Sequence, residues 1–136
     1  MKKLLFTTDG RITRSEYWKA MLIFLGAAIL NGVVYYLLWM VIPGSVSEDG
    51  NYSVTGVRAI PYLALGFGSF VFSVWAGICV NAKRCHDRNK SGWFMLVSLI
   101  PIIGVLWYAI EIPFLRGTRG PNRFGADPRD SVLAIA

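Results

Sequence analysis

Three long apolar stretches constrain this chain more than any other feature of its sequence. They run over residues 20–42, 60–80 and 93–115, and their interiors are almost free of charge. At a rise of about 1.5 Å per residue, about 20 helical residues cross a hydrocarbon core of about 30 Å. A soluble helical bundle would need polar faces at helical spacing, which these stretches lack. The sequence therefore predicts an all-α integral membrane protein with three hydrophobic membrane segments.

The composition agrees with this prediction, because 54% of the residues are apolar and only 16% are charged. A chain of 136 residues has room for one small domain. We therefore expect a single membrane domain over residues 1–136, with a basic tail over residues 116–136. Lys2 and Lys3 precede a short apolar run, but Asp9 ends that run too early for a cleaved signal. The first long segment should therefore stay attached as an anchor.

The charge of the polar segments predicts which side of the membrane each one faces. Residues 1–19 and residues 81–92 each carry a net charge of +3, whereas the loop over residues 43–58 carries −1. Basic segments are retained in the cytoplasm by the positive-inside rule. We therefore expect a multi-pass protein with a cytoplasmic N-terminus and an outward-facing 43–58 loop.

The basic tail conflicts with three simple crossings, which would place it outside. One resolution breaks the third segment at Pro101 and Gly104, so that two short helices enter the membrane and return. This re-entrant form brings all the basic segments to one face, and we favour it. The other resolution is a kinked full span with an exported tail.

The N-terminal element, residues 10–18, contains Thr13 and Glu16 at capping-box spacing. Such a pair starts a helix, because each side chain accepts a hydrogen bond from the other residue's backbone N–H. A well-capped membrane anchor is one interpretation. In the other, Arg11 and Arg14 form an anion-binding pair, and Glu16 orients one of them.

The second polar element, residues 81–93, contains the only histidine of the chain, His86, next to Asp87. These two could form a general base with its orienting acid, or part of a metal site. One His and one Asp supply only two ligands, and no further His or Cys cluster supplies the rest. We therefore predict no metal and no cofactor. A structural hydrogen-bond network and anion recognition remain the stronger alternatives.

The element over residues 120–128 is too rich in Gly and Pro for a helix, so we expect a compact turn. Phe124 would then lie against the interface, while Arg123 reaches a phosphate or a carboxylate. A disordered basic tail is the alternative.

Three further features are open to interpretation from the sequence. Glu111 should either extend to water or pair with an arginine such as Arg84, Arg88 or Arg116. Cys79 and Cys85, six residues apart, lack the spacing of a disulfide or zinc pair. The net charge of +6 does not indicate nucleic acid, because these bases flank hydrophobic spans, where anionic lipid headgroups supply the counter-charge.

Four blocks of the sequence together resemble a known family. They are Gly10-Arg-x-x-Arg-x-Glu-Tyr-Trp18, Arg84-x-His-Asp-x-x-x-Ser-Gly-Trp93, Ile100-Pro-x-x-Gly104 and Asn122-Arg-Phe-Gly-x-Asp-Pro128. In order and spacing they are similar to the YhaH-type family of small bacterial inner-membrane proteins, domain of unknown function 805. The resemblance implies a multi-pass protein of the bacterial inner membrane with no known cofactor and no established activity. Cys85 and Glu111 lie outside the family pattern.

The resemblance names candidate site residues without naming their chemistry. If the basic segments share a face, these residues form one charged cluster at the cytoplasmic mouth of the helices. They are Arg11, Arg14, Glu16, Arg84, His86, Asp87, Ser91, Asn122, Arg123 and Asp127.

The sequence predicts no catalytic residue, so we expect a non-enzymatic scaffold or interaction protein. Its expected partners are membrane lipids with anionic headgroups, a membrane protein or a second copy of the chain. The broken third segment keeps a small oligomeric transporter or channel subunit as an alternative. A membrane enzyme using His86 and Asp87 is a further alternative.

Overall fold

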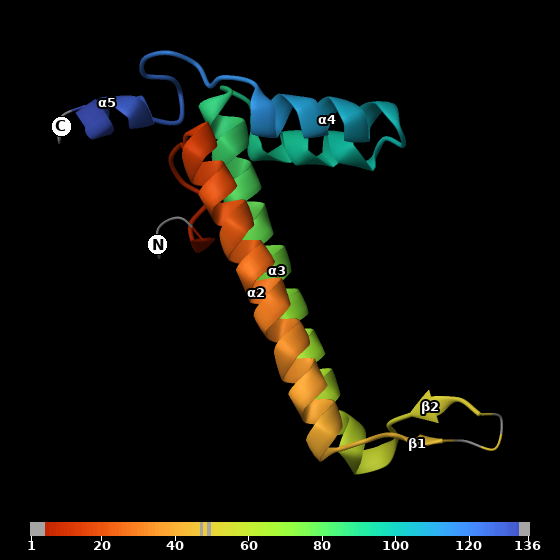
Figure 1. The fold of residues 1–136 in the computed structure, drawn as a ribbon. Coiled ribbons are helices and arrows are strands. Elements are labelled where there is room, and N and C mark those ends of the chain that lie inside the picture. The colour runs from red at the N-terminus through yellow and green to blue at the C-terminus, as the bar shows by residue number, and fades with distance from the viewer. Residues whose placement is uncertain (1–4, 47, 49, 134–136) are drawn as a thin grey trace. The chain divides into compact units, whose positions relative to one another are not determined.

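The computed structural model describes residues 5–46, 48 and 50–133. Lys2, Lys3 and the last three residues of the predicted basic tail lie outside the described residues. The elements follow one another along the chain (Figure 1) as α2 (Arg14–Val41), β1 (Ser45–Val46), β2 (Tyr52–Ser53), η1 (Gly56–Ala59), α3 (Ile60–Asp87), η2 (Gly92–Leu99), α4 (Ile103–Phe114) and α5 (Pro128–Leu133).

The chain divides into two compact units. The first unit contains the residues up to Leu22 and those from Trp75 on, and the second contains Ile23–Val74. The first unit therefore holds the start of α2, the end of α3 and everything that follows α3. All of the candidate site residues lie in it.

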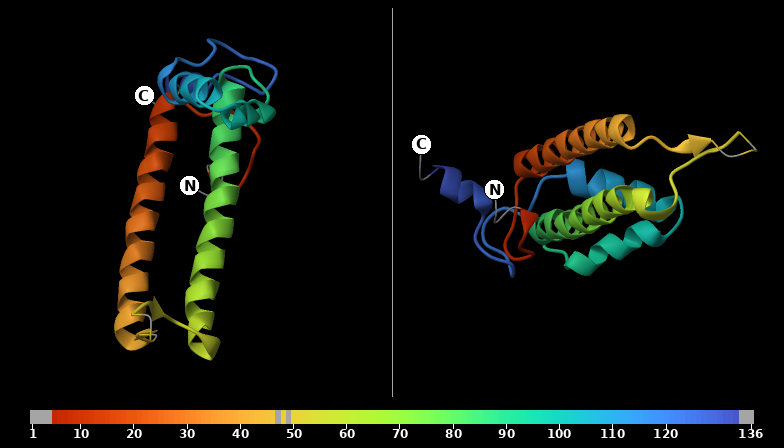
Figure 2. Two further views of the ribbon diagram at one scale, coloured as in Figure 1. Left: turned by 90° about the vertical axis from the view of Figure 1, so that its right-hand side faces the viewer. Right: turned by 90° about the horizontal axis from the view of Figure 1, so that it is seen from below.

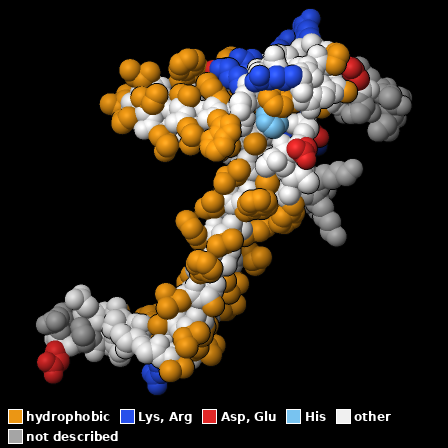
Figure 3. All heavy atoms as spheres, turned by 180° about the vertical axis from the view of Figure 1, so that it is seen from behind, with side chains coloured by type: hydrophobic (Ala, Val, Ile, Leu, Met, Phe, Trp, Pro, Cys, Tyr) orange, Lys and Arg blue, Asp and Glu red, His pale blue; other side chains and the backbone are white. Residues whose placement is uncertain are grey.

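Helices α2 and α3 have the length and composition of the first two predicted membrane segments. Each has 28 residues, which at a rise of about 1.5 Å per residue exceeds a hydrocarbon core of about 30 Å. Their most apolar windows have mean hydropathies of 2.1 and 2.0 and are largely unburied. Figure 3 shows the hydrophobic side chains exposed along these helices. A surface this apolar fits lipid and not water.

The third apolar segment is not a continuous helix. It forms η2 and α4, which lie side by side (Figures 1 and 2) and are joined by a tight turn. The N–H of Ile103 donates to the carbonyl of Pro101 at 2.7 Å, and the residue between them, Ile102, has a φ of 62°. This is a γ-turn, which reverses the chain within three residues. The predicted break at Pro101 and Gly104 is confirmed.

Gly104 makes the close approach of the two short helices possible. A Cβ at this position would lie 2.0 Å from the carbonyl oxygen of Val97, so a larger residue has no room. Helix α4 has 12 residues, a length of about 18 Å, which is too short to cross a bilayer core of about 30 Å.

Helix α2 begins where its capping box predicts. The N–H of Thr13 donates to Glu16 Oε2 at 2.8 Å, and the N–H of Glu16 donates to Thr13 Oγ1 at 3.2 Å. The Glu16 carboxylate is thus bound to Thr13. Arg11 is bound to Asp87, and Arg14 donates to the carbonyl of Phe114. The hypothesis that Glu16 orients one of these arginines is therefore wrong, since Glu16 forms no ion pair among the described residues.

Helix α3 ends in a Schellman motif. Asn89 adopts a φ of 56°, a left-handed conformation that Asn tolerates better than most residues. The N–H of Asn89 donates to the carbonyl of His86, and the N–H of Lys90 donates to that of Cys85, both at 2.9 Å. These bonds satisfy the last carbonyls of α3 and turn the chain back at its charged end.

The second unit holds a short two-stranded hairpin, which follows α2 and precedes α3 in the sequence. Ser45 pairs with Ser53, and Val46 pairs with Tyr52. The hydroxyl of Tyr62 donates to the carbonyl of Ile42 at 2.7 Å. The sequence predicted a loop over residues 43–58 but no strands.

Candidate functional site

The carboxylate of Asp87, the last residue of α3, is the centre of the first unit. Its Oδ1 accepts hydrogen bonds from Nε and Nη2 of Arg11 at 3.2 and 3.0 Å, and its Oδ2 is paired with Nη1 of Arg84. The three side chains are between 0% and 5% exposed. Buried charges are tolerated when they are paired and hydrogen-bonded. We call these three residues the ionic lock.

Two guanidinium groups exceed the charge of one carboxylate, and backbone carbonyl oxygens accept the remaining N–H groups. Arg11 donates to three carbonyls in the segment after α4, and Arg84 donates to two at the end of α4 and one before α2. The acceptors are the carbonyls of Ile12, Ile112, Leu115, Thr118, Gly120 and Gly125. The ionic lock therefore joins the N-terminal segment, α3, α4 and the tail.

The segment after α4 fits closely against Asp87. The N–H and Oγ1 of Thr118 both donate to the Asp87 carbonyl, at 2.8 and 3.0 Å. At Gly117 an added Cβ would lie 1.8 Å from Asp87 Oδ2. Only glycine fits at this position while the ionic lock is intact.

A second ionic group surrounds Glu111 in α4. Its Oε1 lies 3.1 Å from Nη2 of Arg88 and 2.5 Å from Nζ of Lys90, and its Oε2 accepts from Nε1 of Trp107. The ammonium of Lys90 also lies 3.8 Å from the centre of the Phe94 ring, a favourable cation–π distance. Glu111 thus pairs with Arg88, one of the three arginines expected from the sequence. Its second partner, Lys90, was not expected.

His86 is not paired with Asp87, although the two are adjacent in sequence. Its ring stacks on Phe124, with centroids 4.0 Å apart and planes 7° apart, and its Nδ1 lies 3.2 Å from the carbonyl oxygen of Gly10. The carboxylate of Asp87 is bound to two arginines instead. The hypothesis of a His86 base oriented by Asp87 is therefore wrong, because consecutive helical residues point in different directions.

Residues 120–128 form the predicted compact turn. Asn122 and Gly125 exchange two backbone hydrogen bonds of 3.0 Å, and Asn122 Nδ2 donates to the carbonyl of His86 at 2.9 Å. Phe124 lies against His86, and Nη2 of Arg123 donates to the carbonyl of Asn89 at 3.2 Å. The turn is thus attached to the end of α3, and Arg123 meets a carbonyl and not a carboxylate, one of the two partners expected for it.

Asp127 caps the last helix. Its Oδ1 accepts from the backbone N–H of Arg129 at 3.0 Å, and Pro128 occupies the first position of α5, where a missing N–H costs nothing. The side chain of Arg129 and the N–H of Gly120 also donate to this carboxylate, at 2.7 to 2.9 Å. These donors, above all the Arg129 guanidinium, hold the pKa of Asp127 well below its usual value.

An unperturbed Asp carboxyl is half protonated at a pH of about 3.9. At that pH the Asp127 carboxyl of the folded protein is expected to be still ionised. Because its pKa is depressed in the folded state, it stabilises the fold fully above the unfolded pKa, and this contribution is lost as the pH falls through the folded pKa. Carbon NMR titration of this carboxyl, in the folded protein and in denaturant, checks the shift. Coincident titration curves would contradict it, and Arg129→Gln should move the folded curve towards the unfolded one.

The remaining predicted residues have local roles. Ser91 caps η2, accepting from the N–H of Trp93 at 3.4 Å. Arg14 is exposed, and its Nη1 donates to the carbonyl of Phe114 at 3.1 Å. Gly117, Thr118 and Arg129 belong to the site but were not predicted. Only Arg129 had a sequence signal, the Asp-Pro helix start two residues before it.

No metal centre is formed by the described residues, because no group of three or more His, Cys, Asp or Glu side chains lies together in them. Cys79 and Cys85 are buried free thiols, as their spacing predicted.

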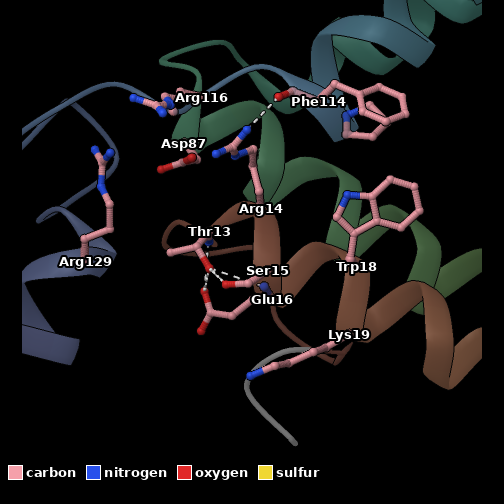
Figure 4. Close-up of a pocket in the computed structure, with 12 residues that line it drawn as sticks. Thr13, Arg14, Ser15, Glu16, Trp18, Lys19, Asp87, Phe114, Arg116 and Arg129 are labelled. Carbon is pink, nitrogen blue, oxygen red and sulfur yellow. Dashed lines mark hydrogen bonds between the residues drawn. The ribbon is translucent and has the colours of Figure 1, made fainter.

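A pocket of about 930 Å³ opens beside the ionic lock, within the first unit (Figure 4). Its lining carries four cationic and two anionic side chains and an apolar wall. The lining residues are Thr13, Arg14, Ser15, Glu16, Trp18, Lys19, Asp87, Pro113, Phe114, Arg116, Gly117 and Arg129. In the apolar wall the rings of Trp18 and Phe114 lie 5.7 Å apart.

The fold and the site define a helical membrane protein in which a buried ionic lock joins the helix ends beside a basic pocket. Residues 5–126 match the family described as protein of unknown function (DUF805), and the chain belongs to this family. The predicted family resemblance is confirmed.

Several relatives come from Escherichia coli strain K12. Inner membrane protein YhaH is 32% identical over 120 residues, which cover 88% of this chain and 85% of that protein. Inner membrane protein YhaI is 27% identical over 122 residues, 89% of this chain and 85% of that protein. Uncharacterized protein YiiR is 22% identical over 154 aligned positions, which cover 96% of this chain and 91% of that protein. No solved structure matches. The chain is accordingly a bacterial inner-membrane protein of a family without an assigned function.

Proposed function

We propose that this protein is a non-enzymatic scaffold of the inner membrane, whose basic surface binds the headgroups of anionic lipids on the cytoplasmic side. The proposal is carried by the contrast between charged groups that are buried in ion pairs and charged groups that are exposed. The buried acid and the two buried arginines of the ionic lock bind one another and the backbone. Arg14, Lys19 and Arg116 are exposed around the pocket instead.

A catalytic role has less support from the same contacts. A general base needs an accessible nitrogen and an orienting partner. Asp87, the acid expected to orient His86, is bound to Arg11 and Arg84, so the pair suggested by the sequence is not formed. A transporter role has less support because the broken third segment exposes apolar side chains at its turn, such as Ile100 and Ile102, where a binding site would need polar groups.

The contacts of the first unit support a re-entrant topology. The third segment starts at Gly92, where an added Cβ would lie 3.2 Å from Ala82 in α3, and it ends at Leu115, whose carbonyl accepts from Arg84 in α3. A segment with both ends beside the end of α3 enters and leaves the membrane on one side. With α2 and α3 as full crossings, the three basic segments would share the cytoplasmic side. The inner leaflet there is negatively charged and attracts Lys and Arg.

A cysteine added after Ala136, in a Cys79→Ser and Cys85→Ser background, is expected to be protected from an impermeant maleimide in intact cells. It should react once the inner membrane is permeabilised, because the tail would be cytoplasmic. Ser53→Cys in β2, in the same background, is the control and should react in intact cells. Reaction of the C-terminal cysteine in intact cells would contradict the proposed topology. It would also contradict the proposal that the lipid-binding surface is cytoplasmic.

A further inference from the structure

We infer that the pocket beside the ionic lock binds one anionic phospholipid, with the lipid phosphate among Arg14, Lys19 and Arg116. This inference rests on the proposed function and deepens it, because it replaces a diffuse basic surface with one built site. The lining comes from four parts of the first unit: the start of α2, the end of α3, the end of α4 with the segment after it, and α5. Figure 4 shows these side chains around one space.

The pocket is suited to an anion because its four bases outnumber its two acids and three of these bases are not in ion pairs. Asp87 is bound to Arg11 and Arg84, and Glu16 accepts from Thr13. Among the described residues, no carboxylate forms an ion pair with Arg14, Lys19 or Arg116.

Arg129 is the fourth base of the pocket, and its guanidinium is bound to Asp127. The three free cations can therefore neutralise an incoming phosphate. Arginine suits phosphate oxygens best, because its planar group donates two parallel hydrogen bonds.

The apolar wall distinguishes a lipid phosphate from a soluble one. Trp18 and Phe114 line the pocket and are 45% and 59% exposed. Leu22, four residues after Trp18 and therefore on the same face of α2, is 66% exposed. A ligand held by its phosphate at Arg14 would lie with its glycerol and acyl part along this face. An amphipathic ring such as that of Trp18 prefers the level of the lipid headgroups.

The pocket also has a suitable size and lies against the ionic lock. Its volume of about 930 Å³ lies within the range of about 300–1,000 Å³ that is usual for small-molecule sites. Asp87 and Gly117 form part of the lining, so the pocket borders the ionic lock at Asp87. Lipid bound here would bridge α2 to the segment after α4 and should stabilise the first unit.

The test uses the full chain, purified in neutral detergent and stripped of lipid. It is titrated with short-chain phosphatidylglycerol, with zwitterionic phosphatidylcholine of the same chain length, and with inorganic phosphate. Thermal unfolding and native mass spectrometry are recorded. We expect phosphatidylglycerol to raise the unfolding temperature and to bind as one molecule per chain. The other two probes should have little effect at equal concentration.

Arg116→Gln and Lys19→Gln are the test variants, because both side chains line the pocket and are exposed. Arg119→Gln is the matched control, since it removes the same charge from an exposed residue of the same segment outside the pocket. Loss of one charge-assisted contact to phosphate should weaken phosphatidylglycerol binding about tenfold or more. The control should bind like the unsubstituted chain.

Three outcomes would overturn the inference. If Arg116→Gln and Lys19→Gln bind like Arg119→Gln, anionic lipid binds the surface diffusely, and the proposed function stands without this site. If inorganic phosphate protects as well as phosphatidylglycerol, the ligand is a soluble phosphate. If phosphatidylglycerol neither binds nor protects the unsubstituted chain, the proposed function fails as well.

Discussion

Asp87→Asn is expected to destabilise the protein by about 3–5 kcal/mol, the usual cost of removing one partner from a buried ion pair. The substitution keeps the shape of the side chain but leaves the guanidinium groups of Arg11 and Arg84 buried without a counter-charge. The N-terminal segment, α4 and the tail would lose the contact that joins them at the end of α3. Thermal unfolding in detergent and tryptic cleavage after Arg119 measure the effect.

Asp130→Asn is the matched control, because this carboxylate is exposed in α5 and should be removed at little cost. A double-mutant cycle adds a second check. Since Arg11 and Asp87 interact directly, Arg11→Gln combined with Asp87→Asn should cost less than the sum of the single substitutions. Unfolding of Asp87→Asn at the temperature of the unsubstituted protein would show that the ionic lock does not stabilise the fold.

Gly117→Ala is expected to cost about 2–4 kcal/mol, between the range for overpacking alone and that for breaking a buried ion pair. Its Cβ would lie 1.8 Å from Asp87 Oδ2 and 2.6 Å from Oδ1, so either Asp87 or the segment after α4 must move. Thermal unfolding in detergent again measures the loss. A loss this large from one methyl group in a loop would be specific to this contact.

Gly68→Ala in α3 is the control, because a Cβ there meets no atom within 4 Å. It should stabilise the helix by up to about 1 kcal/mol, the propensity difference between Gly and Ala. In an Asp87→Ala background the clash at Gly117 is absent, so the added cost of Gly117→Ala should shrink. An equal cost with and without the Asp87 side chain would contradict the clash.

The sequence indicated much of the architecture because lipid imposes simple rules on composition. The apolar stretches gave rise to α2, α3 and the α4 region as expected, since a bilayer of fixed thickness demands runs of fixed length. Pro101 and Gly104 predicted the break in the third segment, and Thr13 with Glu16 predicted the start of α2. Each of these signals acts over a few neighbouring residues.

The site was less predictable because its contacts join distant parts of the chain. Arg11 and Asp87 are 76 residues apart, and six backbone carbonyls complete the coordination of Arg11 and Arg84. Every residue has a carbonyl, so no side-chain pattern marks those acceptors. The sequence-adjacent pair His86 and Asp87 suggested a partnership that the helix geometry rules out.

The sequence by itself determined that the chain enters lipid, where its third segment breaks, and which charged blocks flank the hydrophobic segments. Only the tertiary structure decided that Asp87 binds two arginines, that His86 stacks on Phe124, and that Arg14, Lys19 and Arg116 surround a pocket. The physical reason is range: hydrophobicity and helix capping are local properties of the chain, whereas a buried charge takes its partners from wherever folding brings a donor or acceptor within reach.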